Sequence, residues 1–339
     1  MKVVTFGEIM LRLSPEGYKR FIQSEKFNIS FGGGEANTAV SLANFGVDSV
    51  FVTKLPENDI GQMAVNCLRQ YGVNTSNILR GGERIGVYYL EKGAAQRGSR
   101  VIYDRTNSAI ALASANEFDW ENIFKGASWF HITGITPAIS EKTAHICLEA
   151  CKAAREHSVT ISCDLNYRKK LWNQEEARRV MSNIMQYVDV CIANEEDALN
   201  VFGIYSKNTD VLNGHLNVDG YSYVAKEICN RFGCKKSAIT LRKSLSANDN
   251  EWQAMLYDGK DCFFSKSYYV HIVDRVGSGD SFAAALIYGM LKLMPSNKAL
   301  EFATAASCLK HSIEGDLNQV SVDEVVSLME GNASGRVQR

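Results

Sequence analysis

The sequence predicts an α/β fold in which a mostly parallel central sheet lies between two layers of helices. Short apolar runs rich in β-branched residues recur along the chain, and stretches of helical periodicity, punctuated by Gly or Pro, separate them. Strands and helices that alternate in this way are typical of βαβ units, which build a three-layer αβα sandwich. The expected strands are Val3–Phe6, Ser49–Thr53, Trp129–Thr133, Thr160–Asp164, Val188–Ala193 and Ser237–Thr240, and the expected helices are Ala36–Phe45, Ile60–Tyr71, Glu141–His157, Glu175–Gln186 and Tyr221–Phe232.

Three segments interrupt this alternation, and two of them predict a small second sheet. These two are roughly Ser14–Phe31 and Gly86–Ser108, and the latter contains two runs of strand composition, Val87–Glu91 and Arg100–Arg105. Open α/β sheets bind ligands at the carboxyl ends of their strands, so we expect the small sheet to form a lid over such a site. We therefore expect one domain over residues 1–339, with a lid from insertions at about 14–31 and 86–108. The third segment, Ile204–Gly220, is polar and rich in Asn and predicts a surface loop.

The composition indicates a protein that acts on small molecules. Lys and Arg number 37 against 38 Asp and Glu, and no long run of one sign appears, so we expect no basic surface for nucleic acid or an anionic membrane. No stretch approaches the roughly 18 uninterrupted apolar residues of a membrane-spanning helix, and the first residues lack the layout of a signal peptide. We therefore expect a cytoplasmic protein that binds neither nucleic acid nor membrane.

The nine cysteines are an odd number and are scattered, mostly within apolar runs. Such a distribution argues against a disulfide framework and favours cysteines that pack as small apolar side chains. Cys147 and Cys151 would share a helix face, as a pair of metal ligands could, but no further Cys or His with zinc-site spacing lies near them in the sequence. Burial therefore accounts for this pair as well.

The most informative segment, Asp274–Ala285, places a glycine-rich turn at the start of an apolar helix. Gly277 and Gly279 allow the backbone to approach a ligand closely. The free N–H groups from Gly277 through Ser278 to Gly279, at the positive end of the helix, then form an anion hole. Asp280, in the first helical turn, would lie within reach of both a transferred phosphoryl group and an acceptor hydroxyl, as a general base requires. The alternative is that Asp280 only caps the helix and the glycines only form a turn.

Two familiar glycine-rich nucleotide motifs do not account for this segment. No Gly-Lys-Ser/Thr follows the glycines, as a Walker A loop requires, and Phe282 stands in place of the third glycine of a dinucleotide-binding turn. Together with a second motif, Gly32–Asn37, the signature Asp274–Asp280 instead resembles the two signatures of the ribokinase-like (PfkB) family of carbohydrate kinases, and the resemblance extends over essentially the whole chain. It implies a ribokinase-like αβα sandwich with a β-sheet lid. It also implies a phosphoryl transfer from ATP to a sugar hydroxyl, assisted by Mg²⁺.

The N-terminal motif reads Gly32-Gly33-Gly34-Glu35-Ala36-Asn37. It would pass the backbone of Gly33 and Gly34 beside the substrate without a Cβ in the way. Asn37, on the following helix, could donate to or accept from a substrate hydroxyl. A turn that only caps the helix is the alternative.

The resemblance places ATP farther along the same sheet edge. The family's Asn-x-x-Glu motif here ends in Asp, as Asn194-Glu195-Glu196-Asp197, and implies that Asn194 and Asp197 assist Mg²⁺ through water. A solvated helix N-terminus is the alternative. The family usually has a glycine where Arg242 and its neighbours stand, so ordinary surface charges are the alternative there. The implied nucleotide contacts are Asn194, Thr240, Arg242, Gly277 and Gly279.

Arg12 bears on the substrate, because it stands where neutral-sugar kinases of the family often carry an Asp that accepts bonds from sugar hydroxyls. A guanidinium there removes an acceptor and adds a positive charge, which favours a substrate with its own carboxylate. Four further segments, around positions 86–88, 103–105, 134–137 and 164–168, are similar to the pattern of family members that phosphorylate 2-keto-3-deoxygluconate at its terminal hydroxyl. This resemblance implies a substrate pocket of Gly33, Tyr88, Tyr103, Arg105, Ile135 and Arg168, in addition to Gly34, Asn37 and Asp280.

Other interpretations of these residues stay open at this point. Tyr88 and Tyr103 could be aromatic residues that pack in a sheet, Arg105 could be a surface charge, and Arg168 could pair with Asp164. The chain could phosphorylate a neutral sugar, as fructokinase or ribokinase does, or bind a sugar as a regulator without turnover. The presence of the expected base argues against the regulator.

The predicted lid sheet suggests that two copies of the chain associate. A small exposed sheet leaves one face and its edges uncovered, and pairing with a second copy protects them. We therefore expect a homodimer formed through the lid.

Overall fold

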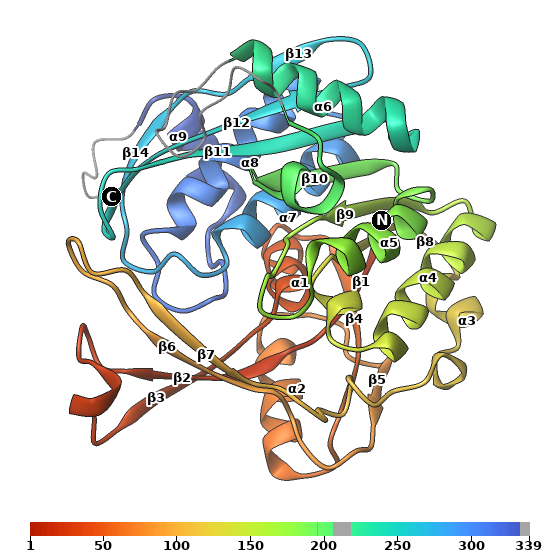
Figure 1. Cartoon of the computed structure of the whole chain (residues 1–339), viewed down its shortest axis with the longest axis vertical. Helices are drawn as coiled ribbons and strands as arrows, with labels where there is room; N and C mark the ends of the chain where they lie inside the picture. Colours follow the sequence, from red (N-terminus) through yellow and green to blue (C-terminus); the bar gives the residue numbers. More distant parts are fainter. Residues whose placement is uncertain (195, 206–217, 333–339) are drawn as a thin grey trace.

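The fold is built on a ten-stranded sheet in the order β13-β12-β11-β10-β9-β8-β1-β4-β5, with β14 paired to β12 (Figure 1). The computed structural model describes residues 1–194, 196–205 and 218–332. Every neighbouring pair from β11 to β5 is parallel, and β12 pairs antiparallel with β11, β13 and β14. The predicted α/β class with a mostly parallel sheet is confirmed. The strands are β1 (Lys2–Phe6), β4 (Asp48–Leu55), β5 (Ile78–Arg80), β8 (Ala127–Thr133), β9 (Thr160–Asp164), β10 (Val190–Asn194), β11 (Lys236–Ser244), β12 (Asp249–Tyr257), β13 (Cys262–Phe264) and β14 (Tyr268–His271).

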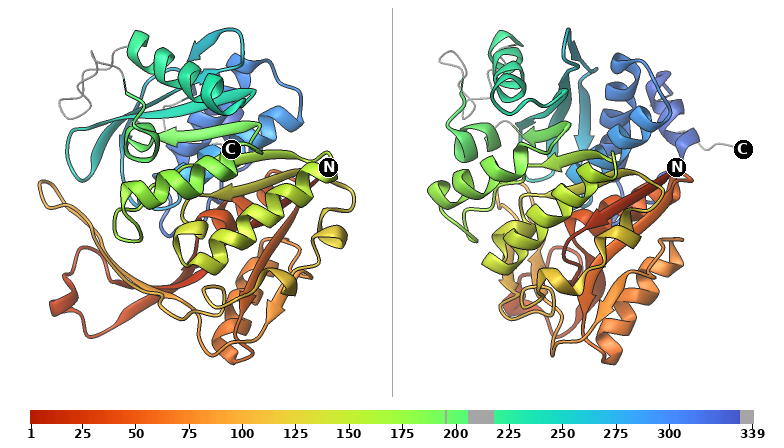
Figure 2. Two further views of the ribbon diagram at one scale, coloured as in Figure 1. Left: turned by 45° about the vertical axis from the view of Figure 1, so that its right-hand side comes forward. Right: turned by 90° about the vertical axis from the view of Figure 1, so that its right-hand side faces the viewer.

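Helices cover both faces of this sheet, which gives the three layers seen in Figure 2. Helices α3 to α6 share one apolar core with the sheet, and α1, α2, α7, α8 and α9 pack against its other face. Helix α7 is buried over most of its surface because it lies against the sheet, α1 and α8. The helices are α1 (Gly34–Asn44), α2 (Asp59–Gln70), α3 (Trp120–Phe124), α4 (Glu141–Glu156), α5 (Gln174–Met185), α6 (Val218–Phe232), α7 (Ser278–Leu291), α8 (Ser296–Lys310) and α9 (Val322–Met329).

The predicted elements of the main layers are present, with ends that differ by a few residues. The largest difference concerns β11, which we predicted over Ser237–Thr240 and which runs over Lys236–Ser244. It is longer because β12, which has no counterpart among the predicted strands, pairs with it as far as Ser244. Residues 218–220, predicted as part of a surface loop, instead begin α6. Residues 206–217 of that loop lie outside the described part of the chain.

The lid is a four-stranded sheet in the order β3-β2-β6-β7, which lies apart from the main sheet in Figure 1. Its strands are β2 (Met10–Pro15), β3 (Phe27–Gly32), β6 (Val87–Glu91) and β7 (Arg100–Asp104). The sheet therefore begins at Met10, ahead of the expected boundary at 14, because β2 follows β1 after only three residues. Strands β2 and β6 pair in parallel, and the two outer pairs are antiparallel.

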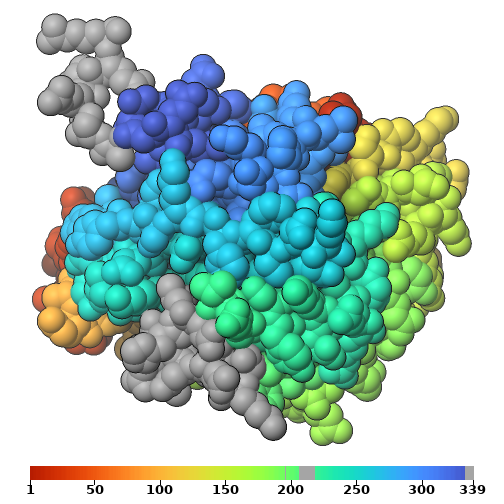
Figure 3. Space-filling view, turned by 90° about the horizontal axis from the view of Figure 1, so that it is seen from above, coloured from red at the N-terminus to blue at the C-terminus, as the bar shows by residue number. Residues whose placement is uncertain are grey.

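The tip of the lid contacts the main domain at the turn between β11 and β12. Ala247 N donates to Ala95 O at 2.7 Å, and Ala95 N donates to Asn248 Oδ1 at 2.7 Å. In the space-filling view the lid residues (orange) lie directly against the segments that follow β11 (Figure 3). The lid thus spans the distance from the β1 side of the sheet to the β11 side.

All nine cysteines are free, and most of them are buried, which confirms that they pack as apolar side chains. Across residues 1–194, 196–205 and 218–332, no group of three or more His, Cys, Asp or Glu side chains is arranged to hold a metal ion. Within the same ranges, no helix combines the length and the apolar character that a bilayer crossing requires.

Candidate active site

The glycine-rich turn before α7 leaves the N-terminus of this helix open to a ligand. Gly277, the residue before the first helical residue, lies in the left-handed region with φ 82°. A Cβ at Gly277 would come within 1.9 Å of the backbone oxygen of Asp316, whereas a Cβ at Gly279 would meet nothing within 4 Å. No side chain caps the helix. The first N–H groups of α7 can therefore bind an anion, as the anion-hole prediction requires.

Asp280 lies three residues into this turn and is 9% exposed. Its Oδ2 accepts a hydrogen bond from Asn37 Nδ2 at 2.7 Å. The alternative in which Asp280 caps α7 is wrong, because the cap position belongs to Gly277 and the carboxylate bonds to a residue of α1.

The surroundings of Asp280 bring its pKa toward neutral pH. Burial raises the pKa of this carboxyl to about 6, and the negative charge of Asp316 raises it too. The hydrogen bond from Asn37 and the charges of Arg168 and Lys310 lower the same pKa. A carboxylate that titrates close to the working pH suits general-base catalysis.

The N-terminal glycine motif brings the start of α1 against the same place. A Cβ at Gly33 would lie 1.9 Å from the backbone oxygen of Glu8, and a Cβ at Gly34 would lie 3.5 Å from Asp280 Oδ1. Asn37 Oδ1 accepts from Gly33 N at 3.2 Å while its Nδ2 donates to Asp280, so one side chain joins both motifs. Helix capping alone does not describe Asn37, since half of its amide serves the second motif.

Two tyrosines of the lid face each other on its inner side. Tyr88 on β6 and Tyr103 on β7 are opposite in register, with ring centroids 6.0 Å apart. Tyr88 is buried and its hydroxyl donates to Asp316, whereas Tyr103 is 39% exposed. Arg105 lies with its guanidinium 5.4 Å from the Tyr103 ring centroid and donates to Glu8. Arg105 is thus buried in an ion pair, and its interpretation as a surface charge is wrong.

Arg12 does not present its charge to a substrate as predicted. Its Nη2 lies 2.6 Å from Asp274, its Nη1 lies 2.5 Å from Asp316, and the side chain is 2% exposed. Two carboxylates of the chain therefore neutralise this guanidinium. The inference that Arg12 binds a substrate carboxylate is therefore wrong, because its charge is already paired within the chain. The sequence around Arg12 could not reveal this, because Asp274 and Asp316 are distant from it in the chain.

Arg168 lies exposed after the end of β9. Its charge lowers the pKa values of Asp164, Asp197 and Asp280, so all three carboxyl groups are near it. Among the described residues no ion pair joins Arg168 to Asp164, the alternative partner. Ile135 lies close by after β8, where its N donates to Thr133 Oγ1 at 3.1 Å.

Two residues predicted for the nucleotide lie on adjacent strands, Asn194 at the end of β10 and Thr240 in the middle of β11. Asn194 on β10 is in register with Thr240 on β11, whose hydroxyl donates to Ala193 O at 3.5 Å. Asp197 is buried, and its two carboxylate oxygens accept from Asn194 N and Tyr167 N, each at 3.0 Å.

Arg242 is exposed two residues farther along β11. Its charge lowers the pKa of Arg275 and of His311, so it lies close to the turn that precedes α7. Arg242 therefore lies near the turn that contains Gly277 and Gly279, which are also predicted to contact the nucleotide.

The model of the pfkB family carbohydrate kinases matches residues 1–217 and 227–321. The chain belongs to the PfkB family. The chain is 52% identical to 2-dehydro-3-deoxygluconokinase from Thermotoga maritima, a solved structure with a TM-score of 0.94 that covers 98% of this chain and 100% of its own. A PfkB family carbohydrate kinase from Listeria grayi is 34% identical with a TM-score of 0.90, covering 97% and 100%. The 2-dehydro-3-deoxygalactonokinase of Haloferax volcanii is 31% identical over 98% of both chains.

Several residues of this PfkB site were not predicted. Asp316 joins the lid to the anion hole, since it accepts from Tyr88 and Arg12 and its backbone packs on Gly277. Glu35 is fully buried, and its Oε1 accepts from Thr133 N at 2.9 Å. Burial raises the pKa of Glu35 to about 7. Asp316 follows α8 in an irregular loop, where no periodicity or spacing signals a role, whereas Glu35 lies inside a motif that was recognised for its glycines.

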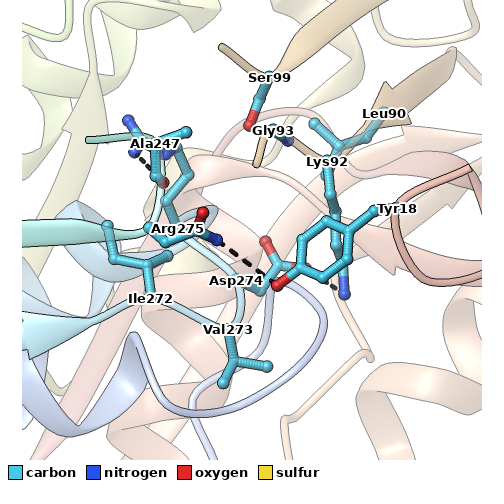
Figure 4. A pocket seen from close by; sticks show the side chains of 11 residues that line it. Tyr18, Leu90, Lys92, Gly93, Ser99, Ala247, Ile272, Val273, Asp274 and Arg275 are labelled. Carbon is cyan, nitrogen blue, oxygen red and sulfur yellow. Dashed lines mark hydrogen bonds and ion pairs between the residues drawn. The ribbon is translucent and has the colours of Figure 1, made fainter. Parts of the chain in front are cut away.

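A small pocket lies where the lid tip of this PfkB kinase meets the turn before α7 (Figure 4). Lys92 of the lid points toward Asp274, with Nζ 3.9 Å from Oδ2. Arg275 donates to Ala247 O at 2.9 Å from the opposite wall. The same turn is thus held both by the lid and by the β11–β12 connection.

Proposed function

We propose that this chain transfers the γ-phosphoryl group of ATP to the terminal hydroxyl of 2-keto-3-deoxygluconate, giving the 6-phosphate, with Asp280 as the general base. The observation that supports this most is the placement of Asp280, buried at the N-terminus of an uncapped helix where both glycine motifs meet. The relative of 52% identity that is a kinase of this sugar acid supports the choice of substrate.

The geometry supports a direct displacement. Asp280 accepts the proton of the substrate hydroxyl, whose oxygen forms the new bond to the γ-phosphorus as the bond to the β-phosphate oxygen breaks and ADP leaves. The N–H groups at Gly277, Ser278 and Gly279 bind the negative charge of the transferred group. Asn37 orients the Asp280 carboxylate through the bond to Oδ2, which leaves Oδ1 for the hydroxyl. Oδ1 lies on the side of Gly34, where we expect the backbone of the glycine motif to contact the substrate.

Substrate recognition divides between two arginines of different availability. Arg105 already pairs with Glu8, so only its remaining N–H donors are available to a substrate. Its buried Nε has no hydrogen-bond partner in the described part of the protein. Arg168 is exposed and near Asp280, so we assign it the main contact with the substrate carboxylate. Tyr88, Tyr103, Gly33 and Ile135 complete the proposed pocket.

ATP and Mg²⁺ belong to the proposed reaction. The side-chain oxygen atoms of Asn194 and Asp197 are suitable ligands for Mg²⁺. Both Asp197 oxygens already accept backbone N–H bonds, so these residues fit a magnesium ion held through water better than one held directly. When bound, the ion would neutralise charge on the phosphates. Thr240 and Arg242 would contact the nucleotide along the same edge.

The outer face of the lid supports the proposed homodimer. This face exposes apolar side chains next to the clustered rings of Phe21, Phe27 and Tyr89. Ile22 is 93% exposed, Ile29 58% and Ile102 42%. Exposed apolar surface of this kind on a small sheet favours burial by a second copy. The cytoplasmic location stays a prediction.

An ADP-release assay tests the function. We expect 2-keto-3-deoxygluconate to be used with a kcat/KM about 10²-fold or more above fructose and ribose, since each 1.4 kcal/mol lost with the carboxylate contact is about tenfold. The galacto epimer belongs in the panel, because one relative acts on 2-dehydro-3-deoxygalactonate. Equal or better use of fructose would leave a neutral-sugar kinase, and binding of the acid without ADP release would leave a sugar-binding regulator.

A further inference from the structure

Lys310, the last residue of α8, is a lysine with a fully buried side chain. Its Nζ donates to Ile313 O at 3.1 Å. A buried ammonium group loses its hydration, so it needs compensating charge or hydrogen bonds from the protein. Within the described part of the chain, no carboxylate lies in direct ion-pair contact with it. The compensation must therefore come from charges at a slightly greater distance.

Those charges belong to the catalytic end of the protein. Burial lowers the pKa of Lys310, and the carboxylates of Asp274, Asp316 and Asp280 raise it. Arg12, which is already paired with two of these carboxylates, lowers it. Lys310 thus adds a second internal cation to a group of three acidic residues that includes the proposed base.

The loop that Lys310 opens packs directly on the turn of the anion hole. His311 O accepts from Val273 N at 2.8 Å and from Asp274 N at 3.2 Å. Gly315 N donates to Asp274 Oδ2 at 3.2 Å. The hydrogen bond from Lys310 Nζ to Ile313 O joins the two ends of the first part of this loop. The ammonium group therefore helps to fix the position of the turn, in addition to its electrostatic effect on the acidic residues there.

We propose that Lys310 is a positioning residue for phosphoryl transfer: its buried ammonium group holds the loop behind the anion hole and keeps Asp280 ionised as the proton acceptor. The proposal rests on the proposed role of Asp280. It assigns a role in the reaction to a side chain that has no path to the substrate, because it is covered on all sides.

The sign of the effect follows from the groups that face Asp280. Asn37 donates to it from α1, and charges act on it from Asp164 at the end of β9, from Arg168 after that strand, from Asp316 in the loop and from Lys310 at the end of α8. Without the positive charge of Lys310, the negative charges of Asp274, Asp316 and Asp280 are neutralised less completely. The pKa of Asp280 then rises, and a larger fraction of the base is protonated at a given pH.

The test compares pH profiles of kcat for Lys310→Met and Lys310→Gln. Met removes both the charge and the donor to Ile313 O, whereas Gln removes the charge and keeps an N–H donor. Lys298→Met, an exposed lysine on the same helix, is the matched control. We expect the acidic limb of both Lys310 variants to move up by about 0.5–1 pH unit, while the control keeps the wild-type profile.

The outcomes are distinguishable. If Gln restores the wild-type limb while Met lowers kcat equally at every pH, Lys310 is only a hydrogen-bond donor and the proposal is overturned. A wild-type limb in both variants overturns it as well, as does loss of thermal stability without any shift of the limb. If Asp280→Asn remains active, the proposed base itself is wrong; if that variant is inactive and the Lys310 limbs are unchanged, only the role of Lys310 is wrong.

Discussion

The turn before α7 and the lid contribute to one site in different ways. The turn is a contiguous, partly buried segment, and backbone contacts with the loop that contains Asp316 hold it in place. The lid is assembled from two distant parts of the chain, exposes its outer face, and reaches the rest of the molecule at its root and at its tip.

This difference separates chemistry from selectivity. The anion hole and Asp280 are the same for any acceptor hydroxyl, so changes there should lower turnover for every substrate. In the proposed function the lid residues and Arg168, which lies outside the lid after β9, contact the variable part of the substrate, so changes there should depend on which substrate is offered. The predictions below test that division.

The largest effect is expected at Asp280. Asp280→Asn should lower kcat by about 10²–10⁴ for every substrate, because an amide keeps the shape but cannot accept the proton. Steady-state kinetics of this variant beside Asp59→Asn, an exposed Asp in the first turn of α2, checks this. A loss below about tenfold would contradict the base.

Thermal unfolding of the same variant should reveal the cost of burying this charge. The pKa of Asp280 in the folded protein is about 6, above its ordinary value of 3.8, so the carboxyl favours folding below pH 4 and this contribution is lost as the pH rises through 6. Asp280→Asn avoids that loss and should be stabilised by up to about 3 kcal/mol at pH 8, since each pKa unit is about 1.4 kcal/mol. The difference from the wild type should shrink toward pH 4, and a variant destabilised at pH 8 would contradict it.

The two glycines of the turn form a matched pair. Gly277→Ala places a Cβ against the backbone oxygen of Asp316. It also requires alanine to adopt a left-handed backbone conformation, which alone lowers the free energy of unfolding by about 1–2 kcal/mol. We expect it to lower the melting temperature and kcat for all substrates. Gly279→Ala meets open space, so it should keep the melting temperature, and any loss of activity there reports on the approach of the phosphate. Equal melting temperatures in both variants would show that the turn is less constrained than its contacts indicate.

Arg168 should give the substrate-dependent effect. Arg168→Ala is expected to lower kcat/KM for the sugar acid by about 10–10²-fold, the value of one charge-assisted contact, and to change the residual rate on fructose little. Arg179→Ala, at an exposed position on α5, is the control. Arg105→Ala is a poorer test, because it leaves Glu8 buried without its partner and should destabilise the fold. A uniform loss on both substrates would place Arg168 with the chemistry instead of the selectivity.

The smallest effect on catalysis is expected on the outer face of the lid. Ile29→Lys should shift the protein from dimer to monomer in light scattering at micromolar concentration, because it places a charge in the proposed interface. Activity should change little if each subunit has a complete site. A wild-type protein that is monomeric under these conditions would contradict the dimer.

The sequence by itself determined the layers and indicated the segment in which we propose that the reaction takes place. Hydrophobic periodicity is a local property, and it predicted six of the parallel strands and most of the helices between them, but it missed the short strand β5 and the short helix α3. The glycine turn at the start of α7 and the Asp280 carboxyl group in its first turn were also predictable, because one uninterrupted segment contains all of them.

The tertiary structure decided which charges are free. Arg12, Arg105 and Arg168 are equivalent in sequence terms, yet Arg12 pairs with Asp274 and Asp316, Arg105 pairs with Glu8, and Arg168 is exposed. An ion pair depends on distance in space, and the partners of Arg12 are separated from it by 262 and 304 positions in the chain. The burial of Lys310 and the meeting of Asn37 with Asp280 have the same origin, because both arise only when α1, α7 and α8 pack together.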